Sequence, residues 1–443
     1  MPDQFLLDCQ WLDIEPDNAE ERLLCHLRIM AGDRCLTSNA RDGEQRDSIL
    51  VSAYPLAAWL VDKYWRLAYE TGGETRPLDW LVSHDLSAAD SGYIWPPLRL
   101  ISNDIGIHIC FLPQEDQPGP RYSSPQSAGS VHIGAFRQGV MNFLRDARGR
   151  IASSWPADPL SQGVEQLEAE LANEELTTWR MLEAALGYDP DGAPDAVMEA
   201  ITELAQLRGL EFCLEAASVY NVCATGSDPL SSLSALAEAA NRVTEHGIDA
   251  LFQPGIEPGA NWRALVPWQA GYKLAQAIRQ LTGLAPARKL ATSVLRDWFR
   301  LPEISFLEGA TLPMGALCRK TASALRFLFP ETSRSFLRVT RRFFLARMAG
   351  ACFYEGEKDS WLAFNDGGVW SQKMQRAFAA ELLAPIAGIR ELVGSRINTI
   401  NLDEIQRISD HYEASPITIC HTLRNNRDIS YEKAAALMAA LAS

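Results

Sequence analysis

The 443-residue sequence holds three groups of side chains whose types could do chemistry. The first is His84-Asp85 followed by Ser91, which are the residue types of a base, an orienting acid and a nucleophile. Their order and spacing match no nucleophile elbow, and adjacent residues such as His84 and Asp85 do not face each other. Residues 91–97, SGYIWPP, predict a loop packed on the tryptophan-rich helix expected within residues 47–70. A ligand or peptide pocket is a better hypothesis for this loop than catalysis.

The second group is acidic. It consists of Glu355, Glu357, Asp359 and Asp366, in a predicted turn. Carboxylates gathered beside a groove can form a catalytic site. Acids in a turn are more often solvated surface groups. Both interpretations stay open for these four residues.

The third group is basic. On a helix that begins near residue 332, four arginines fall on one face: Arg334, Arg338, Arg341 and Arg342. The opposite face carries Phe336, Leu337, Phe343 and Phe344 and is expected to be core. One interpretation is a docking surface for an acidic partner or a phosphate backbone. The other is pairing within the chain to residues 158–199, which hold eleven acidic residues and one basic residue.

Residues 341–385 predict a helix, a polar turn with a short strand, and a second helix that ends before Pro385. This stretch resembles zincin metallopeptidases of the ImmA/IrrE type. The first helix of that family reads R-F-x-L-A-H-E-x-G-H, and a later helix reads F-A-A-E-L-L-x-P. The residues that match are Arg342, Phe343, Leu345, Ala346 and Gly350 in the first motif, and Phe378, Ala379, Ala380, Glu381, Leu382, Leu383 and Pro385 in the second.

The residues that would hold zinc in this family are replaced. Two histidines at i and i+4 bind the metal and the glutamate between them is the general base, but here these positions are Arg347, Ala351 and Met348. The third ligand of the family is an acid about one turn before Phe378; residues 371–377 contain none, and Gln372 and Met374 stand in that region. A guanidinium is always charged and cannot coordinate zinc. The resemblance therefore implies a retained scaffold with no metal, no cofactor and no metal-dependent catalysis.

Composition restricts the class of protein. Hydrophobic residues make up 47% and tryptophans number 12, which indicates globular packing. The nine cysteines are scattered singly, so neither a zinc knuckle nor a redox motif is predicted. With no apolar run long enough to span a bilayer and no signal-like start, we expect a cytoplasmic protein without a membrane partner. The net charge of −15 disfavours non-specific binding to nucleic acid, although a local basic stripe leaves that partner open.

The chain is expected to be α+β and predominantly helical, in three parts. Residues 1–156 predict an α+β domain, residues 157–295 a helical region, and residues 296–443 the degenerate zincin-like domain. Near the C-terminus, residues 402–412 and 416–425 predict a helix-turn-helix-like element. Residues 402–443 hold six acids and four bases, which favours a packing role over base reading.

The leading functional hypothesis is a non-catalytic, zincin-derived regulatory or sensor protein of bacterial type. The resemblance implies a protein partner, such as a helix-turn-helix regulator or a toxin component, in stress response, mobile-element control or phage defence. A DNA-binding transcriptional regulator and a peptidase or hydrolase with an unrecognised site are the alternatives.

Overall fold

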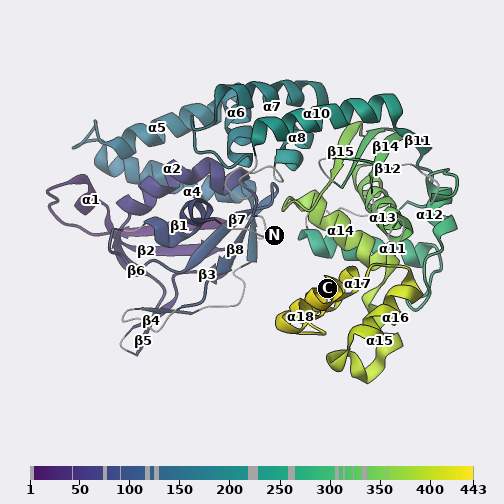
Figure 1. Cartoon of the computed structure of the whole chain (residues 1–443). Coiled ribbons are helices and arrows are strands. Elements are labelled where there is room, and N and C mark those ends of the chain that lie inside the picture. The colour runs from purple at the N-terminus through teal and green to yellow at the C-terminus, as the bar shows by residue number, and fades with distance from the viewer. Residues whose placement is uncertain are drawn as a thin grey trace. The chain divides into compact units, whose positions relative to one another are not determined.

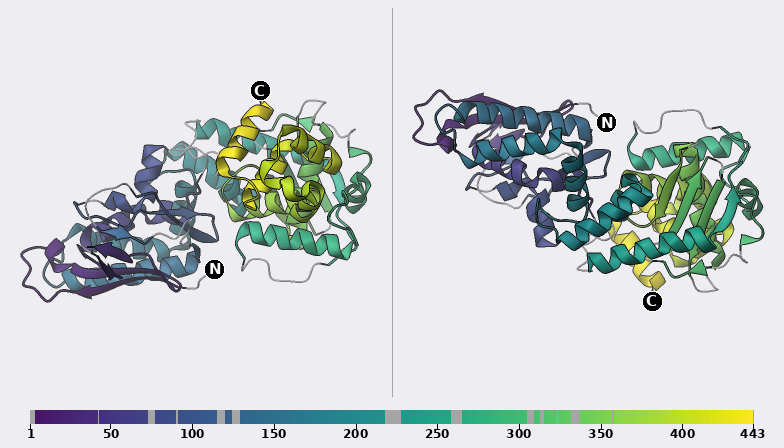
Figure 2. Two further views of the ribbon diagram at one scale, coloured as in Figure 1. Left: turned by 90° about the horizontal axis from the view of Figure 1, so that it is seen from below. Right: turned by 90° about the horizontal axis from the view of Figure 1, so that it is seen from above.

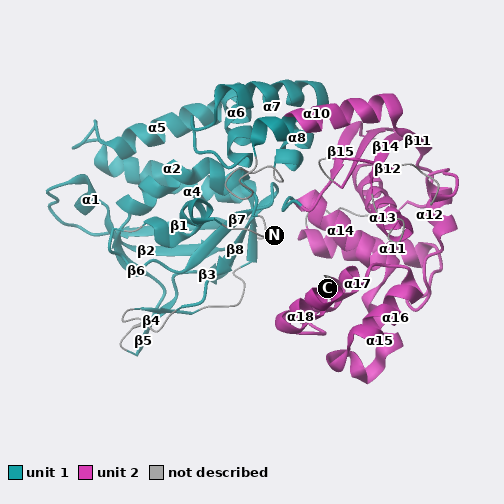
Figure 3. Ribbon diagram, in the orientation of Figure 1, with its two compact units in different colours: residues 1–233, 367–369 teal, residues 234–366, 370–443 magenta. Residues whose placement is uncertain are grey.

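The computed structural model describes residues 4–41, 43–72, 77–89, 91–114, 120–123, 129–217, 228–257, 265–304, 309–312, 315–322, 324–331, 337–356 and 358–442. Two compact units make up the chain (Figure 3). Unit 1 contains residues 1–233 and 367–369, and unit 2 contains residues 234–366 and 370–443. The division at residues 233 and 234 lies inside the predicted helical region of residues 157–295.

Unit 1 begins as an α+β fold of small antiparallel sheets (Figure 1). Its first elements are β1 Phe5–Trp11, α1 Ala19–Arg22, β2 Leu24–Ala31, β3 Arg34–Cys35, β4 Asn39–Arg41, β5 Glu44–Arg46, β6 Ile49–Ser52, α2 Tyr54–Tyr69, α3 Leu78–His84, η1 Leu86–Ala89, β7 Leu98–Ser102, β8 Gly106–Phe111, β9 Arg121–Tyr122, β10 Gly129–His132 and α4 Ile133–Ile151. Strand β2 pairs with β1, β3 and β6, and β8 pairs with β7 and β10. Helices α2 and α4 contribute Trp65, Phe136 and Leu144 to the core that these sheets share.

The second half of unit 1 is helical. It contains α5 Pro159–Ala172, α6 Glu174–Ala185, α7 Asp195–Arg208 and α8 Leu210–Ala217, and α10 Pro229–His246 runs from unit 1 into unit 2. Within the helical region predicted for residues 157–295, the chain breaks between α5 and α6 and again between α7 and α8. Asn173 ends α5 and caps α6, since its side chain accepts from the Leu176 N–H. Gly209 ends α7 with a φ of 95°, a left-handed conformation that suits glycine.

Unit 2 is built on an antiparallel sheet in the order β11-β14-β13-β15, with β12 pairing to β14 in parallel. Its elements are β11 Ile248–Leu251, α11 Pro267–Leu281, α12 Thr292–Trp298, β12 Gly309–Ala310, β13 Ala316–Thr321, β14 Ala324–Pro330, α13 Leu337–Glu355, β15 Ser360–Phe364, α14 Trp370–Leu383, α15 Ile386–Val393, η3 Gly394–Thr399, α16 Leu402–Tyr412, α17 Pro416–Asn425 and α18 Tyr431–Ala442. The sheet lies on one side of α11, α13 and α14, and α15 to α18 lie on the other (Figures 1 and 2).

Helix α14 is the centre of unit 2 because it packs closely against both α11 and α13. A Cβ on Gly271 of α11 would lie 2.5 Å from the Met374 carbonyl oxygen, so only glycine allows the two backbones to approach this far. On the other side, a Cβ on Gly350 of α13 would lie 2.7 Å from the Phe378 ring. Phe378 and Leu382 are fully buried, and the rings of Phe378 and Phe353 lie 6.3 Å apart. Phe378 of α14 therefore packs on α13.

The end of α14 also fixes the next helix. Burial raises the pKa of Glu381, and its carboxylate accepts from the Ile386 N–H and from Gln276, each at 3.0 Å. The Ile386 N–H lies in the first turn of α15, where backbone donors have no partner within the helix. Glu381 therefore joins α11, α14 and α15.

The predicted fold class, α+β and predominantly helical, is confirmed. None of the helices in the described part of the chain is both long and apolar enough to cross a bilayer.

Truncation of the central aromatic should be costly. Phe378→Ala leaves a cavity between α13 and α14, so we expect a loss of about 3–5 kcal/mol in the free energy of unfolding, measured by denaturant titration. Leu281→Ala, at a position of α11 that is 58% exposed, is the control and should change stability by less than about 0.5 kcal/mol. Equal midpoints for the two variants would contradict the central position of α14.

Candidate functional site

Helices α13 and α14 bring together two of the positions that the zincin resemblance singles out. The Arg347 guanidinium on α13 donates from Nη2 to Oε1 of Gln372 on α14, at 2.6 Å. Arg347 stands where the first histidine ligand would be, and Gln372 lies in the region of the third ligand. Both side chains are buried.

Backbone groups before α14 complete this contact. Arg347 Nη2 also donates to the Asn365 carbonyl oxygen at 2.8 Å, and the Asn365 N–H donates to Gln372 Oε1 at 3.0 Å. The rings of Phe344 and Phe364 lie 5.7 and 5.6 Å from the guanidinium carbon. The arrangement is therefore a buried polar contact between two helices, in which Nη2 of the guanidinium meets two oxygen acceptors.

Neither of the other two positions offers a ligand. Met348 and Ala351 are buried in α13, and an alkyl side chain or a thioether supplies neither a general base nor a hard donor for zinc. Among the described residues, no group of three or more His, Cys, Asp or Glu side chains could hold a metal ion.

The prediction that four arginines lie on the face of this helix opposite the core is wrong for two of them. Arg341 and Arg342 are buried, while Phe343 and Phe344 on the supposed core face are only partly buried. Arg341 donates to the Ile304 carbonyl oxygen at 3.3 Å and lies over the Phe329 ring. Helix α13 turns these cations inward because backbone carbonyls and an aromatic face are there to receive them. Arg338 is exposed, and Arg334 lies outside the described residues.

Arg342 reaches three acceptors from a side chain with no exposed surface. It donates to Thr292 Oγ1, to the Leu290 carbonyl oxygen at 3.1 Å and to the Tyr412 carbonyl oxygen at 3.4 Å. Its Nη1 also lies 3.4 Å from Oε2 of Glu413, the residue that follows α16. Arg342 thus joins the start of α13 to the segment before α12 and to the turn between α16 and α17.

A pocket of about 290 Å³ opens at this junction. Its lining includes Lys289, Thr292, Arg296, Glu303, Arg338 and Glu413. Lys289 donates to Glu413 at 2.9 Å, and Arg338 lies 3.4 Å from the same carboxylate. Partial burial alone would raise the pKa of Glu413, but the Lys289 hydrogen bond and the charges of Arg342 and Arg338 lower it below its usual value. Sequence reasoning missed Lys289 and Glu413: Glu413 lies in a polar turn between two predicted helices, and Lys289 lies 124 residues earlier in the chain.

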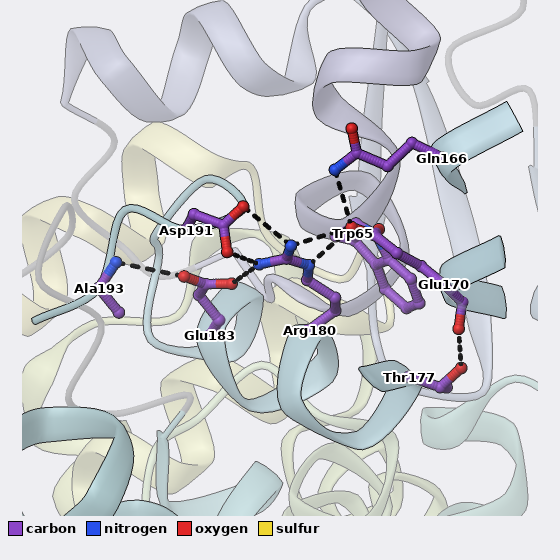
Figure 4. A network of polar contacts seen from close by, with 8 residues as sticks. All are labelled: Trp65, Gln166, Glu170, Thr177, Arg180, Glu183, Asp191 and Ala193. Atoms are coloured by element: carbon purple, nitrogen blue, oxygen red, sulfur yellow. Dashed lines mark hydrogen bonds and ion pairs between the residues drawn. The ribbon is translucent and has the colours of Figure 1, made fainter. Parts of the chain in front are cut away.

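The acidic segment of residues 158–199 finds cations within unit 1. Arg180 is buried, and Figure 4 shows it between the carboxylates of Glu170, Glu183 and Asp191. Its guanidinium lies 2.8–2.9 Å from each of them. Glu170 accepts in addition from Trp65 Nε1 at 2.7 Å. Arg338 and Arg342 form ion pairs with Glu413, so they do not require the acidic segment as counter-charge.

His84 and Asp85 do not form a catalytic pair. The His84 ring stacks on Trp80 with ring centres 4.0 Å apart, and its Nδ1 lies 2.8 Å from the Trp80 carbonyl oxygen. Burial lowers the pKa of His84 to about 3. Asp85 instead forms a salt bridge with Arg99.

The acids of the predicted turn also have structural partners. Glu355 accepts from Ser360 Oγ at 2.7 Å, and Asp359 accepts from the Ala322 N–H at 3.1 Å. Glu357 lies outside the described residues, and Asp366 is exposed. These contacts give Glu355 and Asp359 roles in the local turn.

The helix-turn-helix-like prediction matches two helices, α16 and α17, with the predicted bounds. Asn401 and Glu404 form a capping box at the start of α16, and Ser415 caps α17. Ile405, Ile419 and Leu423 are buried in a core that α15 and α18 share.

Comparison with known proteins gives no relative: no family model, no curated protein and no solved structure matches the chain.

The Glu413 ion pairs should make stability depend on pH. Because the pKa of Glu413 is below its usual 4.5 in the folded state, its ionised form stabilises the fold above pH 4.5, and this contribution is lost as the pH falls through the folded pKa. Glu413→Gln should lose roughly 1.5–3 kcal/mol at pH 7 and progressively less below pH 4.5, in denaturant titrations over that range. Glu391→Gln, at an exposed position of α15, is the control. A difference between wild type and Glu413→Gln that stays constant with pH would show that the charge of Glu413 is unimportant.

Proposed function

We propose that the protein is a non-catalytic regulatory protein that keeps a zincin-like helix pair as a scaffold and has lost the metal site. The observation that carries this proposal is the buried contact between Arg347 and Gln372. A cation that donates hydrogen bonds occupies the place where the family resemblance would put an electron-pair donor to zinc. With an arginine in place of the zinc ligand, the two helices stay joined, but no zinc ion is bound to act as a Lewis acid.

The partner is a protein in this proposal. The resemblance suggests a helix-turn-helix regulator or a toxin component, and the setting is control of stress response, mobile elements or phage defence in a bacterial cytoplasm. Unit 1 and the middle helices, which lie outside the zincin-like stretch, supply the choice of partner. The eight described cysteines are free thiols, which agrees with a reducing compartment.

Restoring the zinc ligands of the family tests whether α13 and α14 derive from the zinc-binding helices of a zincin. The restored variant carries four substitutions: Arg347→His, Met348→Glu, Ala351→His and Gln372→Glu. We expect wild type to contain far less than one zinc per chain by elemental analysis, and the restored variant to bind about one. Two histidines one turn apart share a face of α13, and residue 372 already contacts residue 347 across the helix pair.

The matched control omits Gln372→Glu and therefore lacks the third ligand; it should bind zinc much more weakly. Circular dichroism and a melt without metal establish that each variant is folded. Stoichiometric zinc in wild type, removable by a chelator with loss of a peptidase activity, would reject the non-catalytic assignment. A folded restored variant that binds no more zinc than its control would reject the zincin origin.

The DNA-binding alternative makes a separate prediction. A duplex reader loses affinity steeply as salt rises, because each phosphate contact releases counterions. We expect no salt-dependent duplex binding in a fluorescence anisotropy titration from 50 to 200 mM salt, given the acidic balance of residues 402–443. A steep slope that Arg424→Gln reduces would favour a DNA-binding regulator instead.

A further inference from the structure

The pocket beside Glu413 has more positive than negative charge. Lys289, Arg338 and Arg342 all lie within 3.4 Å of the single carboxylate of Glu413. One negative charge shared by three cations leaves an excess of two, in a chain whose net charge is −15. Lys289, Arg338 and Glu413 line the pocket and Arg342 lies behind them, while Arg296 and Glu303 of the lining balance each other in this count.

The cations differ in how firmly they are held. Arg342 is fully buried and fixed by the carbonyl oxygens of Leu290 and Tyr412, so its charge is in place before any ligand arrives. Arg338 and Lys289 are 56% and 49% exposed and can turn toward a ligand. Arg342 lies behind the lining and contributes only its charge, whereas Lys289 and Arg338 belong to the lining and can contact an anion that enters from solvent.

The Glu413 carboxylate already occupies the place beside the three cations. It follows α16 with a φ of 52° and a ψ of 46°, a left-handed conformation that glycine or asparagine usually takes at a helix end. A residue with a Cβ is disfavoured in this conformation, because the Cβ lies too close to the following carbonyl oxygen. The ion pairs with Lys289, Arg338 and Arg342 offset this strain, and they place a carboxylate where an external anion would bind.

We propose that this pocket binds a phosphomonoester group, which displaces the Glu413 carboxylate from Lys289 and Arg338. A phosphomonoester carries about −1.5 to −2 charges at pH 7 and three terminal oxygens, so it matches the excess of two positive charges better than a second carboxylate does. The hydroxyl groups of Thr292 and Ser293 in the lining add donors of the kind that phosphate oxygens accept. A volume of about 290 Å³ accommodates one such group with a small substituent.

The site does not depend on the zincin-derived function, since none of its residues belongs to the Arg347–Gln372 contact. Its ligand could come from a phosphorylated side chain of a partner protein or from a free phosphorylated metabolite. The phosphomonoester is the chemistry that the two sources share.

The test is isothermal titration calorimetry of the full chain with phosphoserine at constant ionic strength. We expect wild type to bind it and Glu413→Gln to bind it about tenfold more tightly, because the ligand no longer competes with a carboxylate. Arg338→Gln should weaken binding by about tenfold or more, the loss expected for one charge-assisted hydrogen bond. Arg390→Gln is the matched control, since Arg390 of unit 2 is 49% exposed, close to the 56% of Arg338, but pairs with Asp428 outside the pocket.

Each outcome decides the proposal. If neither wild type nor Glu413→Gln gives a heat of binding with phosphoserine, the proposal is overturned. It is also overturned if a folded Glu413→Gln variant binds phosphoserine more weakly than wild type does. Equal effects of Arg338→Gln and Arg390→Gln would show only a general charge effect and overturn it too. Because Arg338 is exposed, its variant should fold even where Glu413→Gln melts at a lower temperature.

Two further titrations distinguish the sources of the ligand. A phosphoserine peptide that binds at least tenfold more tightly than free phosphoserine, while its unphosphorylated form does not bind, would identify a partner protein as the source. Equal affinity for the free and the peptide-borne group would identify a metabolite. Serine serves as the ligand control, and its binding with the same affinity as phosphoserine would reject phosphate recognition.

Discussion

The close approach of α11 and α14 at Gly271 is the constraint on which the architecture of unit 2 depends. With no Cβ between them, the backbones come near enough for α14 to be held from one side by α11 and from the other by α13. This double contact fixes the rotation of α14 about its axis. The rotation in turn decides that Gln372 faces Arg347, that Phe378 faces Gly350, and that Glu381 reaches the first turn of α15.

Buried arginines join the remaining parts of unit 2 to this helix layer. Arg279 of α11 donates to the carbonyl oxygens of Leu382 at 2.6 Å and Arg288 at 2.6 Å, so it links the end of α14 to the segment before α12. Arg342 makes the corresponding link from α13, and Arg347 links α13 to α14. A guanidinium presents five donors in a plane, so one side chain can satisfy several carbonyl oxygens at helix ends and loops. Burial of such a charge is tolerable only with these partners.

The sequence predicts elements whose signals are local. The helix α2, with Pro55 in its first turn, and the bounds of α16 and α17 follow from turn residues, caps and apolar spacing. The helical region predicted for residues 157–295 does not include the breaks at Asn173 and Gly209, because a helical face continues on both sides of each break.

The candidate site was less predictable, for a different reason. Helical spacing places Arg338, Arg341 and Arg342 on one face, but it does not say whether carbonyl oxygens from distant segments receive them. Glu413 and Lys289 are 124 residues apart, and nothing local to either residue indicates that their charges meet. Contacts of this kind depend on tertiary packing, which a single sequence does not encode in any short pattern.

The position of Glu413 also bears on the helix-turn-helix-like element. The turn between α16 and α17 is tied to α13 through Arg342 and to the segment before α12 through Lys289. Ile419 and Leu423 direct one face of α17 into the shared core, and Arg424 of its last turn lies over the Tyr431 ring. A recognition helix needs its cations directed at a groove, whereas this helix uses an arginine in a contact with α18. The charges around the turn hold α16 and α17 to α13 and to the segment before α12, which favours a packing role for the element. The pocket beside the turn is the place that we propose for a ligand.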